Sequence, residues 1–284
     1  MNILYAASEM SPIAKTGGLG DVMAALPAAM RRRGHSVSVA LPLYRQVKQK
    51  LGSLEPTGVE FVVHLGEERH RAKIWRGISR DGILVFAIGN DHFYDREALY
   101  GEGGDYWDNG ARFIFFSKAV VELASWLDPL PQILHVNDWQ TALVPGLVVG
   151  GGLPYRTVFT IHNLAYQGIF PGETFKLTGL PGGYFSSKAY EHFGDFNLMK
   201  GALCLADEVT TVSPGYAEEI QTSAFGCGFD GLLRGRNDRL TGIVNGIDID
   251  VWNPETDQHL PVNYNLEQLD LKTGCKQVLQ RECG

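Results

Sequence analysis

The first stretch whose residue types suggest chemistry is Lys15-Thr16-Gly17-Gly18-Leu19-Gly20-Asp21. It follows a short apolar run at residues 3–7 and opens a pattern typical of a helix. Glycines let the backbone approach a ligand closely, and the free N–H groups and positive end of a helix favour a phosphate. Lys15 would add a positive charge. The same kind of turn also joins strands to helices in α/β proteins that bind nothing there.

The glycine spacing differs from both common nucleotide-binding motifs. Met23 stands where the dinucleotide fingerprint Gly-x-Gly-x-x-Gly has its third glycine, and Pro42 follows the second strand where an NAD site needs an acidic residue. Lys15 precedes the glycines, whereas the lysine of a P-loop follows them. The sequence therefore disfavours both NAD and a P-loop nucleotide.

Three further segments place polar residues directly after strand-like runs, at residues 135–140, 160–168 and 243–248. Ligands of open α/β sheets gather outside the carboxyl ends of the strands, so these segments are candidates for one site. Asp138 and Trp139 offer hydrogen bonds and a flat surface to a sugar, although a helix cap and a core tryptophan fit the spacing equally well. His162 is a lone histidine, which is more often structural than catalytic, and no Ser or Cys nucleophile pattern accompanies it.

The elements that would position these residues alternate between strands and helices. Apolar residues at three-and-four spacing predict a first helix that ends at Gly34. Strands are predicted at 133–135, 157–161 and 209–212, and helices at 112–127, 139–149, 196–206 and 214–221, the last capped by Ser213. We therefore expect a Rossmann-like α/β fold with a mostly parallel sheet and helices on both faces.

Two segments depart from this alternation. Short β-like runs at 61–63, 73–75 and 83–86 predict an inserted antiparallel β-meander. Residues 90–110 are rich in glycine, acidic residues and aromatic rings, and they are too long for a simple connector. We expect this loop to be functional or disordered.

Composition excludes several classes of function. The 284 residues are 44% hydrophobic and can bury a sizeable core, as one large or two ordinary domains. A net charge of -7 argues against nucleic acid as a partner, and no pattern predicts a membrane span. Four cysteines without paired spacing fit a reducing cytoplasm. The spacing Asp248-x-Asp250 is too short to specify a metal site, so we favour a turn or cap role for it.

The glycine turn, preceded by Ala7-Ser8-Glu9-Met10, resembles the opening of bacterial glycogen synthases and plant starch synthases, the family 5 glycosyltransferases. The match is unbroken from Thr160 to Gly168, and the resemblance covers nearly the whole chain. Asn137 is a small departure, because many members have histidine before Asp-Trp. Further matching segments are 108–113, 207–214, 231–234 and 252–254.

The resemblance implies a GT-B architecture, in which two Rossmann-like domains face a cleft. This chain would be the N-terminal half, with a domain at residues 1–260 and a tail at 261–284 leading toward the second domain. In the family, the lysine and glycines of the turn touch the diphosphate of the sugar nucleotide, and the histidine faces the donor glucose. We therefore assign His162 to catalysis, Lys15, Gly17, Gly18, Asp21 and Asn245 to the donor, and Tyr94, Asp138, Trp139 and Asn163 to the acceptor.

The function implied by the resemblance is a retaining α-1,4-glucan synthase. It would move glucose from ADP-glucose or UDP-glucose to the non-reducing end of glycogen or starch, in the cytoplasm, without a metal or organic cofactor. The family's second domain supplies further diphosphate and donor contacts, so residues 1–284 alone are expected to fold but not to transfer glucose at a useful rate. The alternatives are a non-catalytic glucan-binding module and a nucleotide-binding regulatory Rossmann domain. The oligomeric state is not predicted.

Overall fold

The computed structural model describes residues 1–249 and 251–284. The chain forms two compact units, Met1–Asn245 and Gly246–Gly284, and each is described by itself. A compact unit and a family domain are different things, so the domain boundary predicted at residue 260 stays a prediction.

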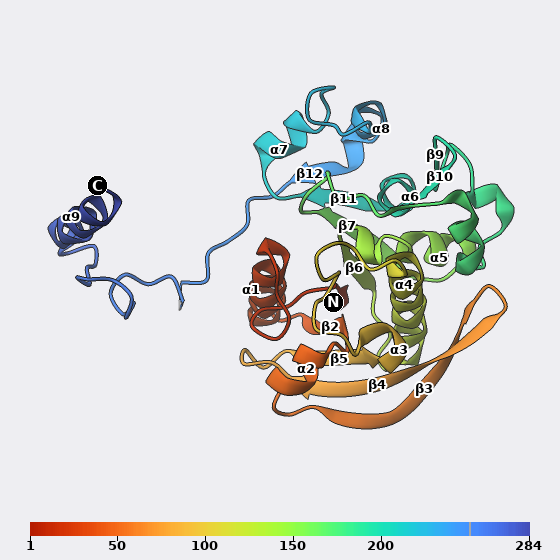
Figure 1. The fold of residues 1–284 in the computed structure, drawn as a ribbon, viewed down its shortest axis with the longest axis horizontal. Coiled ribbons are helices and arrows are strands. Elements are labelled where there is room, and N and C mark those ends of the chain that lie inside the picture. The colour runs from red at the N-terminus through yellow and green to blue at the C-terminus, as the bar shows by residue number, and fades with distance from the viewer. Residues whose placement is uncertain (250) are drawn as a thin grey trace. The chain divides into compact units, whose positions relative to one another are not determined.

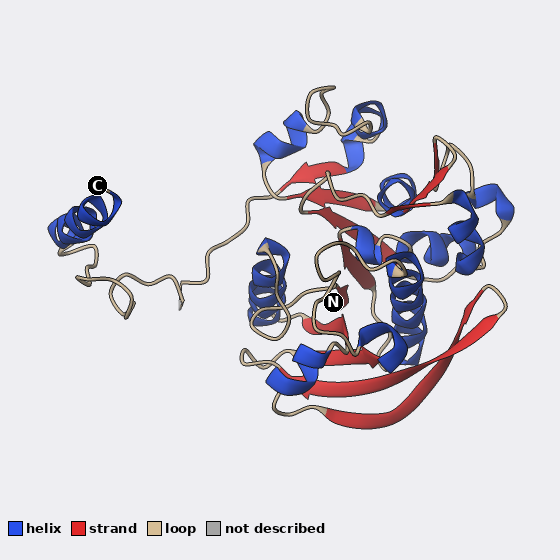
Figure 2. Ribbon diagram, viewed as in Figure 1, coloured by secondary structure: helices blue, strands red, loops and turns tan. Residues whose placement is uncertain are grey.

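The larger unit is built on a mostly parallel sheet (Figures 1 and 2). Within the described residues this sheet has nine strands in the order β12-β11-β7-β6-β1-β2-β5-β4-β3, and only β4 runs against the direction of the others. The strands are β1 (Asn2–Ala6), β2 (Ser36–Pro42), β3 (Glu55–Leu65), β4 (Glu68–Ile78), β5 (Leu84–Gly89), β6 (Ile133–Asn137), β7 (Arg156–Ile161), β11 (Glu208–Thr211) and β12 (Leu240–Gly242).

Helices cover both faces of this sheet, and Figure 1 shows α1 and α4 on opposite sides of it. The α-helices of this unit are α1 (Gly18–Arg32), α2 (Arg45–Lys50), α3 (Asp91–Tyr94), α4 (Asn109–Trp126), α5 (Val144–Gly150), α6 (Leu198–Leu205), α7 (Pro214–Glu219) and α8 (Asp230–Gly235). Short 3-10 helices lie at η1 (Trp139–Thr141), η2 (Gly172–Thr178), η3 (Gly182–Tyr184) and η4 (Asn237–Arg239). The predicted fold class is therefore confirmed.

The inserted meander is also confirmed. Strands β3, β4 and β5 pair antiparallel in sequence, and β5 then joins β2 in parallel, so the meander extends the main sheet. Helix α4 is apolar on most of its surface because both β3 and the neighbouring helices pack against it. Figure 2 shows the long β3–β4 hairpin bending past this helix.

Two predicted helices differ from the observed ones. The segment predicted as one helix at 139–149 forms η1 and then α5, which begins at Val144 with a proline in its first turn. The helix predicted from Phe196 begins at Leu198, because Phe196 pairs with Phe170 in a second, three-stranded sheet. That sheet consists of β8 (Ile169–Phe170), β9 (Glu191–His192) and β10 (Asp195–Asn197). The predicted cap of α7 is confirmed, since Ser213 Oγ accepts a hydrogen bond from the Tyr216 N–H at 2.9 Å.

The order of the strands determines where a ligand can bind. The chain leaves β1 for β2 on one side and later crosses back to place β6 on the other side of β1. The loops after β1 and β6 therefore leave the sheet in opposite directions and open a crevice at its carboxyl edge. The segments after β1, β6 and β7 are the ones that the sequence analysis selected.

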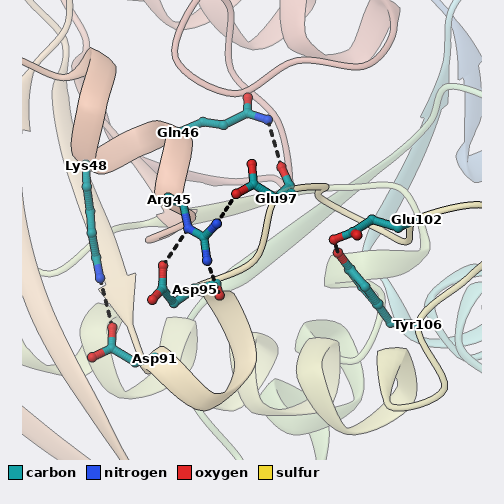
Figure 3. Close-up of polar contacts among 8 residues, drawn as sticks. All are labelled: Arg45, Gln46, Lys48, Asp91, Asp95, Glu97, Glu102 and Tyr106. Carbon is teal, nitrogen blue, oxygen red and sulfur yellow. Dashed lines mark hydrogen bonds and ion pairs between the residues drawn. The ribbon is translucent and has the colours of Figure 1, made fainter.

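The long loop after β5 is held against α2 by exposed polar contacts (Figure 3). Arg45 Nε lies 2.9 Å from Asp95 Oδ1, and a second guanidinium nitrogen of Arg45 pairs with Glu97. Lys48 Nζ lies 2.8 Å from Asp91 Oδ1. Exposed ion pairs each contribute little stability, but together they restrict where this segment can lie.

The smaller unit, Gly246–Gly284, contains η5 (Leu269–Leu271) and α9 (Lys272–Cys283). Asp248 Oδ1 accepts a hydrogen bond from the Val251 N–H at 3.2 Å, which is the turn role predicted for this residue. The same prediction for Asp250 lies outside the described residues. Across the described ranges 1–249 and 251–284, no helix is long and apolar enough to cross a bilayer, and no three His, Cys, Asp or Glu side chains group to hold a metal ion.

Candidate active site

A cavity of about 800 Å³ opens at the carboxyl edge of the sheet, in the larger unit. Its walls come from the segments that follow β1, β6 and β7, together with the loop before α4 and the end of the unit at Asn245. The structure brings seven of the predicted site residues to this cavity: Gly17, Gly18, Asp138, Trp139, His162, Asn163 and Asn245. Lys15, Asp21 and Tyr94 do not line it.

The glycine turn is held by a residue that the sequence analysis did not select. The buried carboxylate of Glu9 accepts hydrogen bonds from the N–H groups of Thr16, at 2.7 Å, and Gly17, at 3.0 Å. It also accepts from the Thr16 hydroxyl at 2.6 Å and from the Tyr100 hydroxyl at 2.8 Å. The Gly17 N–H predicted to face a phosphate is therefore already used. The N–H groups that helix geometry leaves without a partner begin at Gly18.

The glycines of the turn fall into two kinds. A Cβ atom at Gly17 or Gly18 would meet no atom within 4 Å, and Gly17 has an extended φ of -149° that any residue adopts. Neither packing nor the Gly17 backbone therefore requires these glycines, whereas the approach of a ligand from the cavity would. At Gly20 a Cβ atom would lie 2.9 Å from Lys15 Cγ, so this glycine makes room for the lysine stem.

The two predicted charged residues of the turn pair with each other. Lys15 Nζ lies 2.7 Å from Asp21 Oδ1, and the two side chains are 41% and 59% exposed. An exposed ion pair of this kind is weak and exchanges partners easily. Lys15 therefore stands beside the cavity as a cation that can move toward an anion bound there.

Asp138 follows β6 in an uncommon conformation. Its φ is 54°, in the left-handed region that side chains rarely adopt, and its Oδ1 accepts a hydrogen bond from the His162 N–H at 2.8 Å. The carboxylate does not cap the following helix, so the simple capping interpretation is wrong. Burial raises the pKa of Asp138 to about 7, the charge of Glu9 adds to this rise, and N–H groups of His162 and Asn163 oppose it. The carboxyl group therefore titrates near neutrality.

His162 follows β7 and is half-buried on the cavity wall. Its Nε2 lies 3.0 Å from Oδ1 of Asn137, the last residue of β6. Burial lowers the pKa of His162 to about 4, although the nearby charge of Glu9 acts in the opposite direction. The imidazole is therefore neutral at pH 7 and can serve as a hydrogen-bonding group.

Trp139 combines the two roles that the sequence left open. Its ring packs edge-on against Phe113 at a centroid distance of 4.9 Å and lies 5.8 Å from the ring of Phe170. It also covers Gly168, where a Cβ atom would lie 2.6 Å from the indole. The ring is nevertheless only partly buried and lines the cavity, so it supports the wall and offers a surface to a ligand.

Asn163 and Asn245 are exposed residues of the cavity lining. Asn163 Oδ1 accepts a hydrogen bond from the Ala165 N–H at 3.0 Å, which fixes a turn beside His162. Asn245 is the last residue of the larger unit. Its amide lies on the same cavity as the glycine turn, as the sequence predicted.

Tyr94 is the predicted acceptor residue that needs correction. It is fully buried at the end of α3, and its hydroxyl donates a hydrogen bond to the Arg112 carbonyl at 3.0 Å. Its ring packs against Tyr44 and Phe115. A side chain in this position stabilises the core and cannot stack on a sugar. The same loop instead places Tyr100 and Tyr106 on the cavity.

Glu9 and Tyr100 are the functional candidates that sequence reasoning missed. Glu9 is an acidic residue directly after a buried strand, and the strand-end argument applied to the later segments would have selected it. Tyr100 lies 91 positions from Glu9, and its hydroxyl also lies 2.7 Å from Ser8 Oγ. No local pattern indicates a contact over that separation.

The chain matches known proteins over almost its whole length. The family model of the starch synthase catalytic domain matches residues 2–235. The chain is 44% identical to glycogen synthase 2 of Geobacter sulfurreducens and 45% identical to glycogen synthase of Anaeromyxobacter sp., in both cases over 100% of this chain and 60% of the relative.

A solved structure is similar over almost the whole chain. It is the catalytic domain of starch synthase IV from Arabidopsis thaliana bound to ADP and acarbose, with a TM-score of 0.87 and 34% identity. The likeness covers 99% of this chain and 59% of that one, so the chain spans about three fifths of the proteins it matches. The chain belongs to the starch synthase catalytic domain family of glycosyltransferases.

Proposed function

We propose that residues 1–284 supply one wall of the active site of a retaining α-1,4-glucan synthase. The enzyme would transfer glucose from ADP-glucose or UDP-glucose to the non-reducing end of glycogen or starch in the cytoplasm. One observation carries this proposal: a glycine turn that packing does not require and a neutral histidine line the same cavity. The ADP and acarbose bound to the related starch synthase support it.

The donor diphosphate would bind at the start of α1. Negative charge grows on the leaving diphosphate during glucosyl transfer, so catalysis needs positive groups there. The N–H groups of the first turn, beginning at Gly18, and the positive end of α1 meet this need. Lys15 would exchange Asp21 for a phosphate oxygen, while Asn245 would contact the nucleotide side of the donor.

The glucose and the acceptor would lie on the side of the cavity formed after β6 and β7. His162 would hydrogen-bond near the reacting carbon, because a neutral imidazole donates from one ring nitrogen and accepts at the other. Asp138, Asn163 and the face of Trp139 would contact acceptor sugars. Trp139 would stack on a sugar ring, whereas Asp138 and Asn163 would bond its hydroxyls.

A single wall cannot exclude water or align two substrates. We propose that the portion of the relatives beyond the matched three fifths supplies the second wall, with further cations for the diphosphate. Residues 1–284 alone would then fold and bind ligands weakly, yet transfer glucose slowly. We call a protein of the relatives' length that contains residues 1–284 the long form.

The test compares residues 1–284 with the long form in a transfer assay using radiolabelled ADP-glucose and, in parallel, UDP-glucose. We expect transfer by the long form and a large but measurable reduction of it in His162→Ala. NMR titrations of residues 1–284 should show shifts at Gly18 on adding ADP and at Trp139 on adding a malto-oligosaccharide. Shifts with the glucan alone, and no transfer by the long form, would favour the glucan-binding module. Equal transfer by both proteins would refute the one-wall proposal.

A further inference from the structure

The side chain of Asn137 is fixed before any ligand arrives. Asn137 is 1% exposed at the end of β6, and its Nδ2 lies 3.2 Å from the carbonyl oxygen of Ala6 and 3.4 Å from that of His135. Both carbonyls accept hydrogen bonds from the amide nitrogen. A reversed amide would bring Oδ1 against two carbonyl oxygens, which repel it. Oδ1 therefore faces Nε2 of His162, at 3.0 Å.

This orientation decides which nitrogen of His162 carries the proton. The amide oxygen of Asn137 can only accept, so Nε2 of the neutral ring must donate and Nδ1 must be unprotonated. Among the described residues Nδ1 has no hydrogen-bond partner, and His162 lines the cavity. An acceptor atom is thus left for a ligand.

We propose that Asn137 is a positioning residue that holds His162 as its Nε2–H tautomer, so that Nδ1 accepts a hydrogen bond from a hydroxyl group of the bound sugar. The identity of that ligand rests on the proposed function, whereas the tautomer rests on the geometry alone. The opposite tautomer would present an N–H donor at Nδ1. The site would then also bind a ligand group that lacks a hydrogen to donate. The arrangement therefore selects a hydroxyl at this position of the sugar.

The charged and titratable groups around His162 leave the ring neutral. Glu9, after β1, favours the imidazolium, but burial outweighs it and lowers the pKa of His162 to about 4. Asp138, after β6, bonds the His162 main chain and has a pKa raised to about 7 by burial. Burial also lowers the pKa of His135, the other histidine nearby, to about 3. At pH 7 the tautomer therefore determines what His162 offers.

The test measures ring ¹⁵N chemical shifts of residues 1–284 labelled in histidine, with His162→Gln used only to assign the signal. We expect Nδ1 of His162 to show the shift of an unprotonated nitrogen and Nε2 that of a protonated one. Asn137→Leu should abolish this preference, while Asn245→Leu, which alters another asparagine of the same cavity, should keep it. A protonated Nδ1 in the unchanged protein would overturn the proposal.

Asn137→Ala removes the same amide with a smaller side chain if the leucine variant does not fold. Without the amide oxygen Nε2 has no fixed acceptor, so the ring should lose its preference for the Nε2–H tautomer. An unchanged preference would mean that residue 137 does not set the tautomer, and would overturn the proposal.

Transfer by the long form tests the sugar contact. Asn137→Ala should lower transfer, because the sugar hydroxyl then meets a ring of mixed tautomers. Glucosyl donors that carry fluorine in place of one hydroxyl should include one that is at least tenfold poorer for the unchanged protein but not for His162→Ala. No such donor would overturn the hydroxyl contact. If the unchanged long form transfers no glucose, the proposed function is refuted, while the tautomer result is unaffected.

Discussion

Asp138→Asn tests whether the site is built at the expense of stability. Burial raises the pKa of Asp138 from 3.8 to about 7 in the folded chain. Between these values the folded chain holds a proton that the unfolded chain releases, so unfolding becomes easier as the pH rises. Three pKa units correspond to a loss on the order of 4 kcal/mol between pH 4 and pH 7. A neutral asparagine removes this loss and can still accept from the His162 N–H.

The two neighbouring histidines change stability in the opposite direction. Burial lowers the pKa of His162 to about 4 and that of His135 to about 3, from 6.5. Above pH 6.5 these histidines do not oppose folding. As the pH falls from 6.5 toward the lowered pKa values, the unfolded chain takes up protons that the folded chain does not, and stability is lost. The pH profile of the unchanged chain therefore mixes both signs. The difference between Asp138→Asn and the unchanged chain isolates the carboxylate.

Urea unfolding of residues 1–284 from pH 5 to pH 8 measures this difference. At pH 5 the variant should be more stable by about 1–2 kcal/mol, because the unfolded carboxyl group is already mostly ionised, and at pH 8 by about 4 kcal/mol. In the long form the same variant should transfer less glucose. Asn245→Asp, which adds an exposed carboxylate to the same cavity, controls for a general effect of charge. A stability difference that does not change with pH would refute the buried, neutral-pH carboxyl group.

Three further outcomes are expected. Gly18→Ala should keep the thermal midpoint and weaken ADP binding at least tenfold by titration calorimetry. Gly20→Ala should lower the midpoint, because its Cβ atom would press on Lys15. Equal midpoints would refute the distinction between the two glycines. Tyr100→Phe should lower the free energy of urea unfolding by about 1–2 kcal/mol and raise the KM for the donor, because Glu9, which holds the turn, loses a hydrogen bond. An unchanged KM would show that this loop does not affect donor binding. Arg45→Ala should leave the thermal midpoint nearly unchanged and speed amide hydrogen exchange at residues 95–97. Unchanged exchange would show that the ion pairs in Figure 3 do not restrain the loop.

The sequence was sufficient for the fold class because the alternation of strands and helices is local. Apolar periodicity and glycine punctuation gave the parallel strands, the meander and the helices around them within a few residues. The start of α6 was wrong because Phe196 pairs with Phe170, 26 positions earlier. A pairing over that distance competes with helix propensity and leaves no trace in a short window.

The strand-end rule found most of the candidate site, because it depends on topology and not on side-chain detail. It selected Asp138 and His162 at neighbouring strands, and the structure joins them by a hydrogen bond. It could not separate buried from exposed aromatic residues within one loop, which is why Tyr94 was chosen over Tyr100. Burial inside a loop depends on contacts with distant elements, such as that between Tyr94 and Tyr44.

Unfavourable features gather at this one cavity, and this argues that the cavity was selected for binding. Asp138 has a left-handed backbone and a carboxyl group whose ionisation burial opposes. Gln140, also in the lining, has a buried Oε1 without a hydrogen-bond partner among the described residues. Each feature lowers the stability of the free chain, and such features persist where a ligand gains from them. A ligand that donates hydrogen bonds to Oε1 of Gln140 and to Nδ1 of His162 would supply both acceptors with a partner. The free energy lost by the empty site would then become affinity for a hydroxyl-rich ligand, which an apolar or purely anionic one could not gain.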